Sequence, residues 1–578
     1  MNPALEYNKW LKTITCPRLG EQLRQMSEAE KQAAFGSALV FGTGGLRGLL
    51  GAGTNRLNVY TVRQATQGLG KYLNSMKTGR PISVAIAYDS RMQSTEFAQA
   101  AAEVLAASGI RVFIFRRLAP TPLLSYAVRS LGCDAGIIIT ASHNPAPYNG
   151  YKVYGSDGCQ ITLEAAARIQ AEISRVDLFE GVHTLPFQTG LSEGHIAYIS
   201  EELDNRFLEE VHACAVYPAV AAQVGLRVVY TPLNGTGYLP VKKMLEQIGV
   251  QNLFIVPEQS LPDGHFSTCP KPNPEERSAY KLALALAQEK RADLVLATDP
   301  DCDRVGAMVR DVQGDYQFLT GNETGVLLLH YILSGRQAQG TLPAHPVVVS
   351  TIVSTALGGL IAGRFGAAFI QTLTGFKFIG EQVGLLEKAG RAGDFVFGFE
   401  ESNGCLPGAY VRDKDAVAAV MLLCEMASYY KKRGQTLLDV LDILYREYGY
   451  FRHKLLSFTF SSMEGMQEMT SIMEWFRKKR AVTFAGLRCL RTDDYLTSVS
   501  YDCLGEVSGD LTLPASNVLC FHLERDSEVI LRPSGTEPKL KCYLTAKGDS
   551  MDEVEQLLDA IAQSVSQAIG MNEMNQVV

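Results

Sequence analysis

Long apolar runs are missing from this chain of 578 residues. A membrane-spanning helix needs about 18 or more consecutive apolar residues, and no stretch of the sequence approaches that length. The opening segment, MNPALEYNKWLKTITCPRLGEQLRQ, carries scattered charges and lacks the apolar centre of a secretory signal peptide. We therefore expect neither a membrane span nor a signal peptide.

Closely spaced cysteine pairs are missing as well. The twelve cysteines lie far apart in the sequence, and none belongs to a C-x-x-C motif. Structural zinc sites and disulfide frameworks usually show such pairs, so the spacing argues against both. We interpret the cysteines as reduced, mostly packed thiols, and we expect a cytoplasmic protein.

The chain has no excess of positive charge. With 54 basic and 61 acidic residues, its formal net charge is -7. We therefore expect no general binding to nucleic acid or to a membrane surface, although a local basic pocket for phosphate is compatible with this composition. A content of 46% apolar and 20% charged residues is typical of a globular protein with packed cores.

Short apolar runs alternate with helix-like segments up to about residue 445. The runs predict strands over residues 82–88, 111–115, 136–140, 226–232, 253–256, 293–301, 347–353 and 395–402. The segments between them predict helices near residues 94–108, 238–248, 277–290 and 413–432. This alternation is typical of α/β domains, in which helices cover a largely parallel sheet.

The rest of the chain has a different pattern, with expected helices near residues 463–478 and 551–569 around closely spaced strands. A length of 578 residues allows about four domains of ordinary size. We therefore expect four domains, of which three are α/β and the last is a smaller α+β domain. Their predicted boundaries are residues 1–200, 201–320, 321–447 and 448–578.

Three aspartates alternate in the segment DPDCDR, directly after an expected strand. In an extended segment, Asp299, Asp301 and Asp303 would point to one side. Three converging carboxylates repel one another unless a cation joins them, and oxygen ligands on a short loop favour a hard ion such as Mg²⁺. A solvated acidic loop or a calcium site is the alternative interpretation.

Two further segments combine polar groups in patterns that bind phosphate. In RPSGTEP, Arg532 can bind a phosphate through two N–H groups while Ser534 and Thr536 complete a cradle. In TASHNP, Ser142 lies at the carboxyl end of an expected strand, where α/β proteins bind ligands. A polar hairpin turn and an ordinary Asn-Pro turn are the respective alternatives. In the latter case His143 would be structural and Lys152 exposed to solvent.

Two weaker segments have less specific patterns. FGTGGLRG contains Arg47 in a glycine-rich stretch but does not match a dinucleotide-binding or P-loop motif. In GFEESNG, Glu400 and Ser402 would lie on one side of an extended stretch and would suit sugar hydroxyls, with a surface turn as the alternative.

Together these segments resemble the α-D-phosphohexomutase superfamily, and most closely its long phosphoglucomutases. TASHNP, DPDCDR, TLTGFKFIGE, GFEESNG and RPSGTEP occur in the order of that family, and the similarity spans residues 41–541. The resemblance implies four domains around a central cleft. They would supply, in order, the phosphoserine, the metal ligands, the sugar-binding residues and the phosphate-binding residues.

The implied activity is an isomerase that interconverts glucose 1-phosphate and glucose 6-phosphate through a phosphoserine and glucose 1,6-bisphosphate. By resemblance, Ser142 would carry the phosphoryl group. Asp299, Asp301 and Asp303, with an oxygen of that phosphate, would hold one Mg²⁺ ion per subunit. His143 and Lys152 would be the candidates for proton transfer.

The resemblance also implies a set of residues that contact the substrate. Arg304 and Lys377 would touch it directly, and Glu400 and Ser402 would bind the sugar hydroxyls. The phosphate that does not react would be held by Arg532, Ser534, Gly535 and Thr536. Arg47, Thr374, Gly375 and Lys414 would also line the cleft.

Three positions depart from the family pattern. Cys302 stands where relatives often have alanine or glycine, and we expect its side chain to point away from the ion. Asn234 stands where many relatives have histidine, so we assign that loop no catalytic role. Asn403 replaces a common aromatic or aliphatic residue after GFEES, which leaves the fine sugar preference open.

Alternatives to a phosphoglucomutase stay open at this point. Phosphopentomutases and glucose-1,6-bisphosphate synthases share nearly the same motifs. A metal-dependent phosphatase would benefit from further ligands, yet the nine histidines are scattered with no close pair. A sensor or scaffold without activity is disfavoured by the intact Ser142 and aspartates. In each case we expect sugar phosphates as partners, and a monomer or a dimer.

Overall fold

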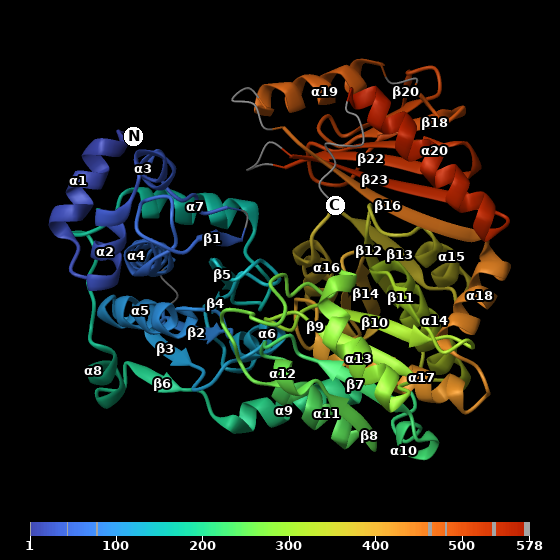
Figure 1. Cartoon of the computed structure of the whole chain (residues 1–578), viewed down its shortest axis with the longest axis horizontal. Coiled ribbons are helices and arrows are strands. Elements are labelled where there is room, and N and C mark those ends of the chain that lie inside the picture. Colours follow the sequence, from blue (N-terminus) through green and yellow to red (C-terminus); the bar gives the residue numbers. More distant parts are fainter. Residues whose placement is uncertain are drawn as a thin grey trace. The chain divides into compact units, whose positions relative to one another are not determined.

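The computed structural model describes residues 2–42, 44–76, 79–460, 465–479, 482–534 and 539–570 (Figure 1). The chain divides into two compact units. The first comprises Met1–Val349 and Phe376–Thr436, and the second comprises Ser350–Gly375 and Leu437–Val578. In the part of the chain that the structure describes, no helix has both the length and the apolar character needed to cross a bilayer. The twelve cysteines are all free, and ten of them are buried.

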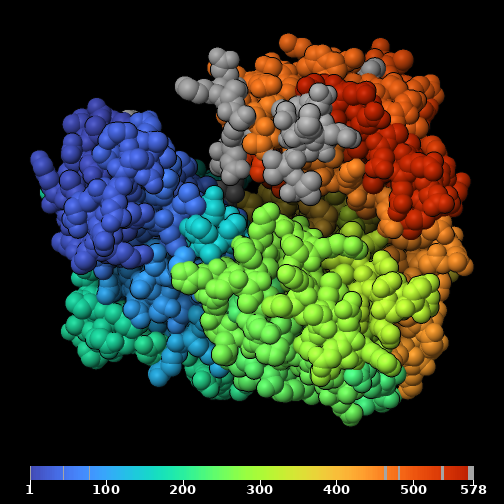
Figure 2. Space-filling model, viewed as in Figure 1, coloured from blue at the N-terminus to red at the C-terminus, as the bar shows by residue number. Residues whose placement is uncertain are grey.

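Three helices that the sequence pattern did not predict precede the first sheet: α1 (Pro3–Thr13), α2 (Pro17–Gln25) and α3 (Glu28–Phe35). Side chains from all three, including Trp10, Leu23 and Phe35, pack into a small core. Asn2 and Ser27 cap α1 and α3 by accepting backbone N–H groups. This segment is the darkest blue part of the surface in Figure 2.

The first sheet has the strand order β1-β5-β4-β2-β3-β6. Its strands β2, β3, β4 and β6 are parallel, as predicted, whereas β5 runs antiparallel to β4 and to β1. The sheet is thus largely parallel, as predicted, and its antiparallel edge arises because residues 140–147 are too few for the crossover that a parallel connection requires. The strands are β1 (Gly45–Leu49), β2 (Ser83–Tyr88), β3 (Arg111–Ile114), β4 (Ala135–Ile139), β5 (Tyr148–Gly155) and β6 (Ile196–Tyr198).

Helices cover this sheet and bury its central strands. Every residue of β2 and β4 is buried, which explains their nearly continuous apolar sequences. The helix α5 packs against β2, β3 and β4, and α4 packs against α5 and α7. The helices of this part are α4 (Val59–Ser75), α5 (Ser94–Ala107), α6 (Thr121–Ser130), α7 (Leu163–Ser174), α8 (Phe187–Ser192) and α9 (Glu201–Ala213).

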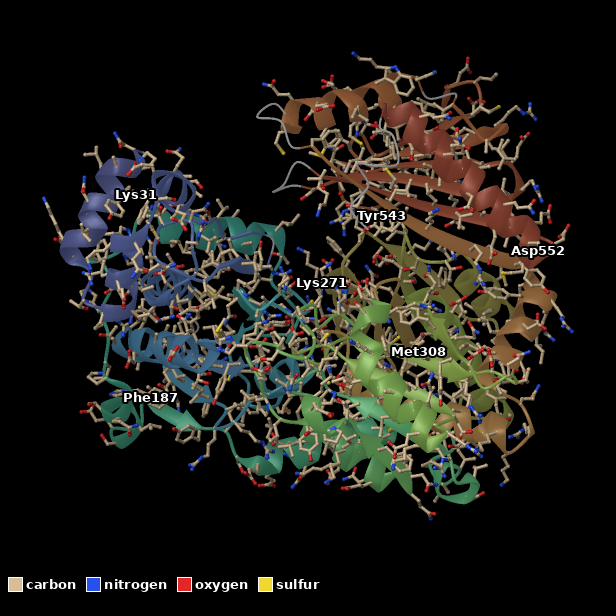
Figure 3. All side chains as sticks on the ribbon, viewed as in Figure 1. Lys31, Phe187, Lys271, Met308, Tyr543 and Asp552 are labelled. Atoms are coloured by element: carbon tan, nitrogen blue, oxygen red, sulfur yellow. The ribbon has the colours of Figure 1, made fainter. Side chains whose placement is uncertain are left out.

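The second sheet has the order β11-β10-β9-β7-β8, in which β7 is parallel to β8 and β9, and β10 is antiparallel to β9 and β11. Met308 of β10, labelled in Figure 3, belongs to its core. The strands are β7 (Arg227–Thr231), β8 (Asn252–Ile255), β9 (Leu294–Thr298), β10 (Val305–Arg310) and β11 (Tyr316–Leu319). The helices are α10 (Ala221–Val224), α11 (Tyr238–Gln247), α12 (Pro257–Ser260), η1 (Arg277–Tyr280) and α13 (Lys281–Lys290).

The third sheet contains β12 (Val347–Thr351), which is parallel to β14 (Phe395–Glu400), and β15 (Gly404–Leu406), which forms a hairpin with β14. Its helices are α14 (Gly321–Gln339), α16 (Phe376–Lys388), η2 (Ala392–Asp394) and α17 (Ala416–Lys431). Almost all of α17 is buried, so it is apolar on every side rather than amphipathic.

Asp415, which is buried, caps the N-terminus of α17. Its carboxylate accepts hydrogen bonds from the N–H groups of Val417 and Ala418 and from the hydroxyl of Tyr410. Burial outweighs these hydrogen bonds and raises the pKa of the Asp415 carboxyl to about 6. Because this pKa is higher in the folded state than in the unfolded state, the group stabilises the fold below about pH 4. That contribution is lost as the pH rises from about 4 through 6.

We expect Asp415→Asn to gain stability relative to the parent as the pH rises. The amide oxygen keeps the cap but carries no charge, so the loss avoided is at most about 3 kcal/mol above pH 6. Calorimetric melting midpoints at pH 4.5, 6 and 7.5 measure this difference. Asp559→Asn, on an exposed carboxylate of another helix, is the control and should show no such trend. A difference between Asp415→Asn and the parent that does not change with pH would contradict the prediction.

The second unit is built on a sheet of the order β16-β23-β22-β21-β18-β19-β20, with β17 paired to β18. Its strands are β16 (Tyr450–Thr459), β17 (Thr483–Phe484), β18 (Leu487–Asp494), β19 (Val499–Asp502), β20 (Val507–Asp510), β21 (Leu519–Leu523), β22 (Glu528–Pro533) and β23 (Lys539–Gly548). The helices α19 (Gly465–Lys479) and α20 (Met551–Ile569) match the two predicted there. A core that includes Phe458, Phe476, Phe521 and Ile561 joins these helices to the sheet. The unit also contains α15 (Leu357–Arg364), β13 (Ala368–Thr372), α18 (Leu437–Tyr448) and η3 (Glu524–Asp526).

Candidate functional site

Ser142 follows β4 in a strained backbone conformation. Its φ angle is 51°, in the left-handed region that residues with a Cβ atom rarely adopt. Its N–H donates to the hydroxyl of Thr140 at 2.8 Å, which helps to hold this turn. Its Oγ donates to Oδ2 of Asp299 at 2.7 Å and lies 3.3 Å from Nδ1 of His143. The structure therefore brings together a hydroxyl and a carboxylate that are 157 residues apart in the chain.

A buried arginine holds the loop that carries Ser142. Arg91, just after β2, donates to the backbone carbonyls of Ser142, Asn144, Pro145 and Tyr148. Its side chain is fully buried and forms an ion pair with Asp89, 3.3 Å away. Four carbonyls on one guanidinium fix the path of the turn more firmly than the turn's own hydrogen bonds would. The sequence analysis missed Arg91, because a side chain that binds backbone carbonyls leaves no pattern in the sequence.

The three aspartates converge, as predicted, but not in an extended segment. The strand β9 ends at Thr298, and residues 299–303 form a turn in which Cys302 has a φ angle of 52°. Oδ1 of Asp299 accepts the N–H groups of Asp303 and Arg304, both at 3.1 Å, and so closes this turn on itself. The alternation predicted the convergence for the wrong geometric reason, because a turn, rather than a strand, aims the carboxylates.

The aspartate trio, Asp299, Asp301 and Asp303, has the chemistry of a site for a hard cation. Each offers an oxygen within 4.8 Å of the others, and all three are buried. Oδ1 of Asp301 and Oδ1 of Asp303 have no hydrogen-bond partner among the described residues. Burial and the two neighbouring carboxylates raise the pKa of Asp299 well above its ordinary value. Buried oxygens without partners, in a group that repels itself, fit a divalent ion such as Mg²⁺.

Two lysines partly neutralise the trio. Nζ of Lys152, on β5, lies 2.8 Å from Oδ2 of Asp301 and 3.8 Å from Oδ2 of Asp303. Nζ of Lys414 lies 3.0 Å from the same oxygen of Asp303. Burial opposes the charge of both lysines, yet the aspartates raise the pKa of each. Both are therefore ammonium groups beside the carboxylates, and Lys152 is not the solvent-exposed lysine of the alternative interpretation.

His143 and Arg47 complete the surroundings of Ser142. Burial, together with the charges of Arg304 and Arg47, lowers the pKa of His143 well below its ordinary value. The imidazole is therefore neutral at pH 7. Arg47 lies on β1 and donates to Oδ1 of Asn144 at 3.1 Å, so it contacts the same turn as Arg91. Residues 45–49, which include Arg47, form the strand β1 that pairs with β5.

Hydrogen bonds connect the end of the aspartate turn to the hairpin of β14 and β15. The N–H of Val305 donates to the carbonyl of Asn403 at 3.1 Å, and Nδ2 of Asn403 donates back to Val305 at 3.0 Å. Arg304 forms an isolated β-bridge with Gly404 and an ion pair with Glu275. Asn403 thus has a structural task. Glu275, which the sequence analysis missed, orients the guanidinium of Arg304.

Glu400 and Ser402 do not share an extended stretch, so that part of the prediction is wrong, although a hydrogen bond joins their side chains. β14 ends at Glu400, and residues 401–403 form the turn, in which Asn403 has a φ angle of 61°. A turn of three residues reverses the chain, which removes the alternation of sides. Glu400 itself is buried. Burial raises its pKa, and the charges of Lys414 and Arg304 oppose that shift.

The remaining predicted site residues fall in both units. Lys377 lies in the first turn of α16 in the first unit, and burial lowers the pKa of its ammonium. Thr374 and Gly375 belong to the second unit, where Gly375 has a φ angle of 121°. Arg532 lies on β22 of the second unit, and the N–H of Ser534 donates to Lys539 at 2.7 Å. Gly535 and Thr536 lie outside the described residues.

Asn234 and Cys302 are the two other positions that depart from the family pattern, and the structure shows what surrounds each. Nδ2 of Asn234 donates to the carbonyls of Glu258 and Leu261, at 3.2 and 2.7 Å, so this side chain secures its own loop. Cys302 is fully buried, and burial raises the pKa of its thiol well above the ordinary value. The thiol is therefore protonated at neutral pH.

Four family models match the chain in sequence order. They are described as the phosphoglucomutase/phosphomannomutase alpha/beta/alpha domains I, II and III and the C-terminal domain of the same family. The matched residues are 38–179, 205–314, 320–448 and 519–564. Together these matches cover more than half of the chain.

Curated relatives and solved structures agree with these matches. The chain is 36% identical over 561 residues to a phosphoglucomutase of Staphylococcus aureus strain MSSA476, covering 96% of this chain and 98% of the relative. It is 36% identical over 559 residues to one of Staphylococcus epidermidis strain ATCC 12228, covering 96% of this chain and all of the relative (100%).

Two solved structures share the fold at low sequence identity. The phosphoglucomutase pp63/parafusin from Paramecium has a TM-score of 0.69 at 16% identity and covers 94% of this chain and 98% of its own. A phosphoglucomutase/phosphomannomutase family protein from Burkholderia thailandensis has a TM-score of 0.65 at 17% identity, with coverage of 92% and 98%. By its family models and its curated relatives, this chain belongs to the phosphoglucomutase/phosphomannomutase family.

Proposed function

We propose that the protein is a magnesium-dependent phosphoglucomutase that interconverts glucose 1-phosphate and glucose 6-phosphate. Ser142 carries the phosphoryl group, and glucose 1,6-bisphosphate is the intermediate and the activator. The proposal includes the cytoplasm as its location and the predicted division into four domains. One observation carries it: the hydroxyl of Ser142 donates a hydrogen bond to a buried carboxylate of the aspartate trio.

In the first half of the reaction, the 6-hydroxyl oxygen of glucose 1-phosphate attacks the phosphorus of phosphorylated Ser142. The bond from phosphorus to Oγ breaks as the bond to the sugar oxygen forms, and the product is glucose 1,6-bisphosphate. The proton of the attacking hydroxyl leaves at the same time. We assign proton transfer to His143 and Lys152. The neutral imidazole of His143, whose Nδ1 lies 3.3 Å from Oγ of Ser142, can accept this proton, and the ammonium of Lys152, beside Asp301, can donate one to the departing Oγ.

In the second half, Oγ of Ser142 attacks the phosphorus at C1 of the intermediate. Oγ gives up its proton as it bonds to phosphorus, the C1 oxygen takes up a proton as its bond to phosphorus breaks, and glucose 6-phosphate leaves phosphorylated Ser142 behind. The intermediate must therefore present each of its phosphates to Ser142 in turn. A binding site that grips the other phosphate in both orientations suits this symmetry, and Arg532, Ser534, Gly535 and Thr536 are the residues that we assign to it.

Catalysis of phosphoryl transfer depends mostly on positioning and on neutralisation of charge. Asp299, Asp301 and Asp303 would hold Mg²⁺, which stabilises the negative charge on the transferring group. Lys152 and Lys414 add fixed positive charge at the same place. Further residues assigned to the substrate are Arg47, Arg304, Thr374, Gly375, Lys377, Glu400 and Ser402.

Intact-mass measurement tests the relay residue. We expect a fraction of the purified protein to carry an added mass of about 80 Da that maps to Ser142 and increases with glucose 1,6-bisphosphate.

Comparing kcat/KM for glucose 1-phosphate and ribose 1-phosphate tests the substrate. A clear preference for the pentose would replace the proposal by a phosphopentomutase. Accumulation of the bisphosphate would indicate a synthase, and release of inorganic phosphate as fast as isomerisation would indicate a phosphatase.

Arg91→Lys tests how the Ser142 turn is positioned. Lysine keeps the charge but cannot bind four carbonyls at once, so the turn loses its anchor. Because a displacement of about 1 Å at a reacting group can cost on the order of 100-fold in rate, we expect kcat to fall by roughly 10- to 100-fold while KM changes little.

Steady-state kinetics and melting curves measure the effect of Arg91→Lys. Arg63→Lys, in the partly exposed ion pair with Glu103, is the control and should leave kcat unchanged. An Arg91→Lys enzyme with the parent's kcat would show that the four hydrogen bonds do not position Ser142.

A further inference from the structure

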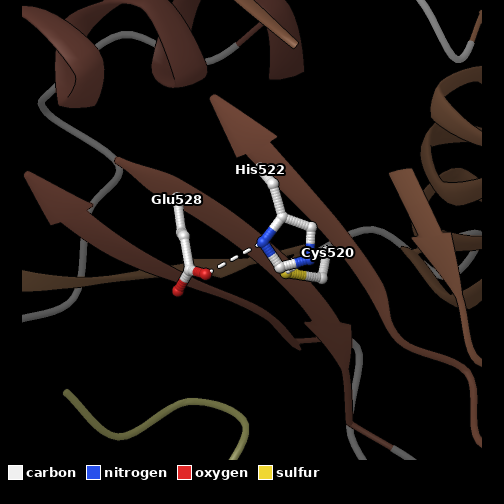
Figure 4. A group of neighbouring side chains, drawn as sticks. All are labelled: Cys520, His522 and Glu528. Atoms are coloured by element: carbon white, nitrogen blue, oxygen red, sulfur yellow. Dashed lines mark hydrogen bonds and ion pairs between the residues drawn. The ribbon is translucent and has the colours of Figure 1, made fainter. Parts of the chain in front are cut away.

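A second cluster of metal-ligand side chains lies in the second unit. Cys520 and His522 on β21 and Glu528 on β22 each place a ligand atom within 4.8 Å of the other two. Figure 4 shows the three side chains together on neighbouring strands, with a ring nitrogen of His522 turned toward Glu528. None of them belongs to a motif that pointed to the phosphoryl-transfer site.

The sheet itself brings these residues to one face. Cys520 and His522 are two positions apart on β21, so both side chains project from the same side. The strand register places Glu528 opposite His522, and Asp493 of β18 opposite Cys520. Their neighbours Leu519, Phe521 and Val529 alternate with them and belong to the hydrophobic core. The cluster is therefore held by three paired strands rather than by a loop.

His522 lies between two carboxylates. Its Nδ1 is 2.9 Å from Oε1 of Glu528, and its Nε2 is 2.8 Å from Oδ2 of Asp493. Sγ of Cys520 is 3.4 Å from Nε2, and Arg491 approaches that nitrogen to 2.8 Å. The Nε2 side is thus already filled by Asp493 and Arg491. Among the residues that the structure describes, Nδ1 is the nitrogen that contacts a carboxylate and no cation.

Burial differs within the cluster in a way that suits an ion. Cys520 and Asp493 are buried, whereas the side chains of His522 and Glu528 keep 25% and 22% of their exposure. An ion can therefore reach the cluster from solvent and still be held by groups that are shielded from it. Three protein ligands would leave one position of a tetrahedral ion for water.

We propose that Cys520, His522 through Nδ1, and Glu528 bind one transition-metal ion of the zinc type. A thiolate and an imidazole select such an ion over Mg²⁺, which prefers oxygen ligands alone. Asp493 then accepts the hydrogen bond from Nε2–H and fixes the ring, in the arrangement that typically supports a metal-bound histidine. Such an ion has bonds of about 2.3 Å to sulfur and about 2.0 Å to nitrogen and oxygen, so Sγ of Cys520, which lies 3.4 Å from Nε2, moves toward Nδ1 on binding.

The exchange balances in charge. Without an ion, the cluster is an imidazolium held between two carboxylates, beside a neutral thiol. An imidazolium fits this position because each ring nitrogen lies within 2.9 Å of a carboxylate oxygen. On binding, the proton on Nδ1 and the thiol proton leave to solvent, and bonds from the ion to nitrogen, sulfur and oxygen form. Two protons leave and one dication enters, so the net charge of the cluster does not change.

Titration with Co²⁺ tests this site, because cobalt occupies zinc sites and absorbs strongly when a thiolate binds it. The full-length protein is stripped with a chelator and then titrated in saturating Mg²⁺, which fills the aspartate trio. We expect one equivalent of Co²⁺ to bind with a sulfur-to-cobalt absorption band, and Zn²⁺ to displace it. Cys520→Ala should abolish the band. Cys542→Ala, at a buried thiol on the core side of the same sheet, should keep it.

Variants of the two carboxylates add a readout that does not remove the thiol. Asp493→Asn should weaken Co²⁺ binding by about 10- to 100-fold while the band keeps its shape. Glu528→Gln, which removes a ligand, should weaken it further. Melting curves of each variant show whether the sheet is intact. Binding of Co²⁺ without the band, a band that survives Cys520→Ala, or Asp493→Asn and Glu528→Gln proteins that are folded and bind normally would each overturn the proposal.

Discussion

Ser142→Ala is expected to lower kcat by at least about 10⁴-fold, because it removes the atom to which the phosphoryl group is bonded during the cycle. The variant should also lose the added mass of about 80 Da, whatever the concentration of glucose 1,6-bisphosphate. Folding should change little, since the hydroxyl contacts only Asp299, which a metal ion would otherwise bind, and the neighbouring His143 among the described residues. Coupled assays of glucose 6-phosphate formation and intact mass measure the two effects.

A buried hydroxyl elsewhere provides the matched control for this experiment. Ser428 lies in α17, and its Oγ donates to the carbonyl of Cys424 at 2.8 Å. Ser428→Ala removes the same atoms from an equally buried position and should retain both activity and phosphorylation. If Ser142→Ala turned over substrate at the parent's rate, the relay role of this residue would be refuted, and with it the proposed cycle.

Asp299→Asn is expected to stabilise the protein in the absence of metal and to abolish its response to Mg²⁺. The amide oxygen can still accept the N–H groups of Asp303 and Arg304, while the repulsion within the trio falls. Where Mg²⁺ is present at 100 times its Kd, the parent should gain about 2.7 kcal/mol, and the variant should gain almost none. We expect turnover to fall by roughly 10³-fold or more.

The expected change in melting temperature has opposite signs with and without Mg²⁺, which distinguishes this prediction from simple damage. A variant that is simply damaged would melt at a lower temperature with and without Mg²⁺. Asp299→Asn should instead melt at a higher temperature than the parent in a chelator and at a lower one in Mg²⁺. Asp311→Asn is the control, since Asp311 lies in the turn between β10 and β11, beyond the other end of β10. An unchanged Mg²⁺ response in Asp299→Asn would remove the basis for a metal at the trio.

Several strands of the first unit could be predicted because a strand that is buried on both faces takes apolar residues at nearly every position. β2 and β4 are buried at every residue, so their apolar runs stand out, and their predicted ends differ from the observed ones by about one residue. The same signal fails for β1 and β5, whose residues include glycine, arginine, lysine and asparagine. The antiparallel pairing of β4 with β5 depends on the length of a connection, not on the composition of either strand.

The site divides in a similar way. Motifs name Ser142 and the three aspartates, because groups that meet a ligand are restricted in type and spacing. The residues that aim them are not so restricted. Arg91 binds backbone carbonyls of residues 51–57 positions further along the chain. Glu275 forms an ion pair with Arg304, which is 29 positions away. Such partners are chosen by the folded geometry, and only the folded structure names them.

The paired hydrogen bonds between Val305 and Asn403 couple the carboxylate turn to the hairpin that carries Glu400. A shift of the carboxylate turn would also move the hairpin, so the position of neither segment can change alone. Under the proposed function, a change toward a different carbohydrate would have to exchange side chains on a fixed backbone, since moving the loop assigned to sugar binding would also disturb the turn assigned to the metal ion.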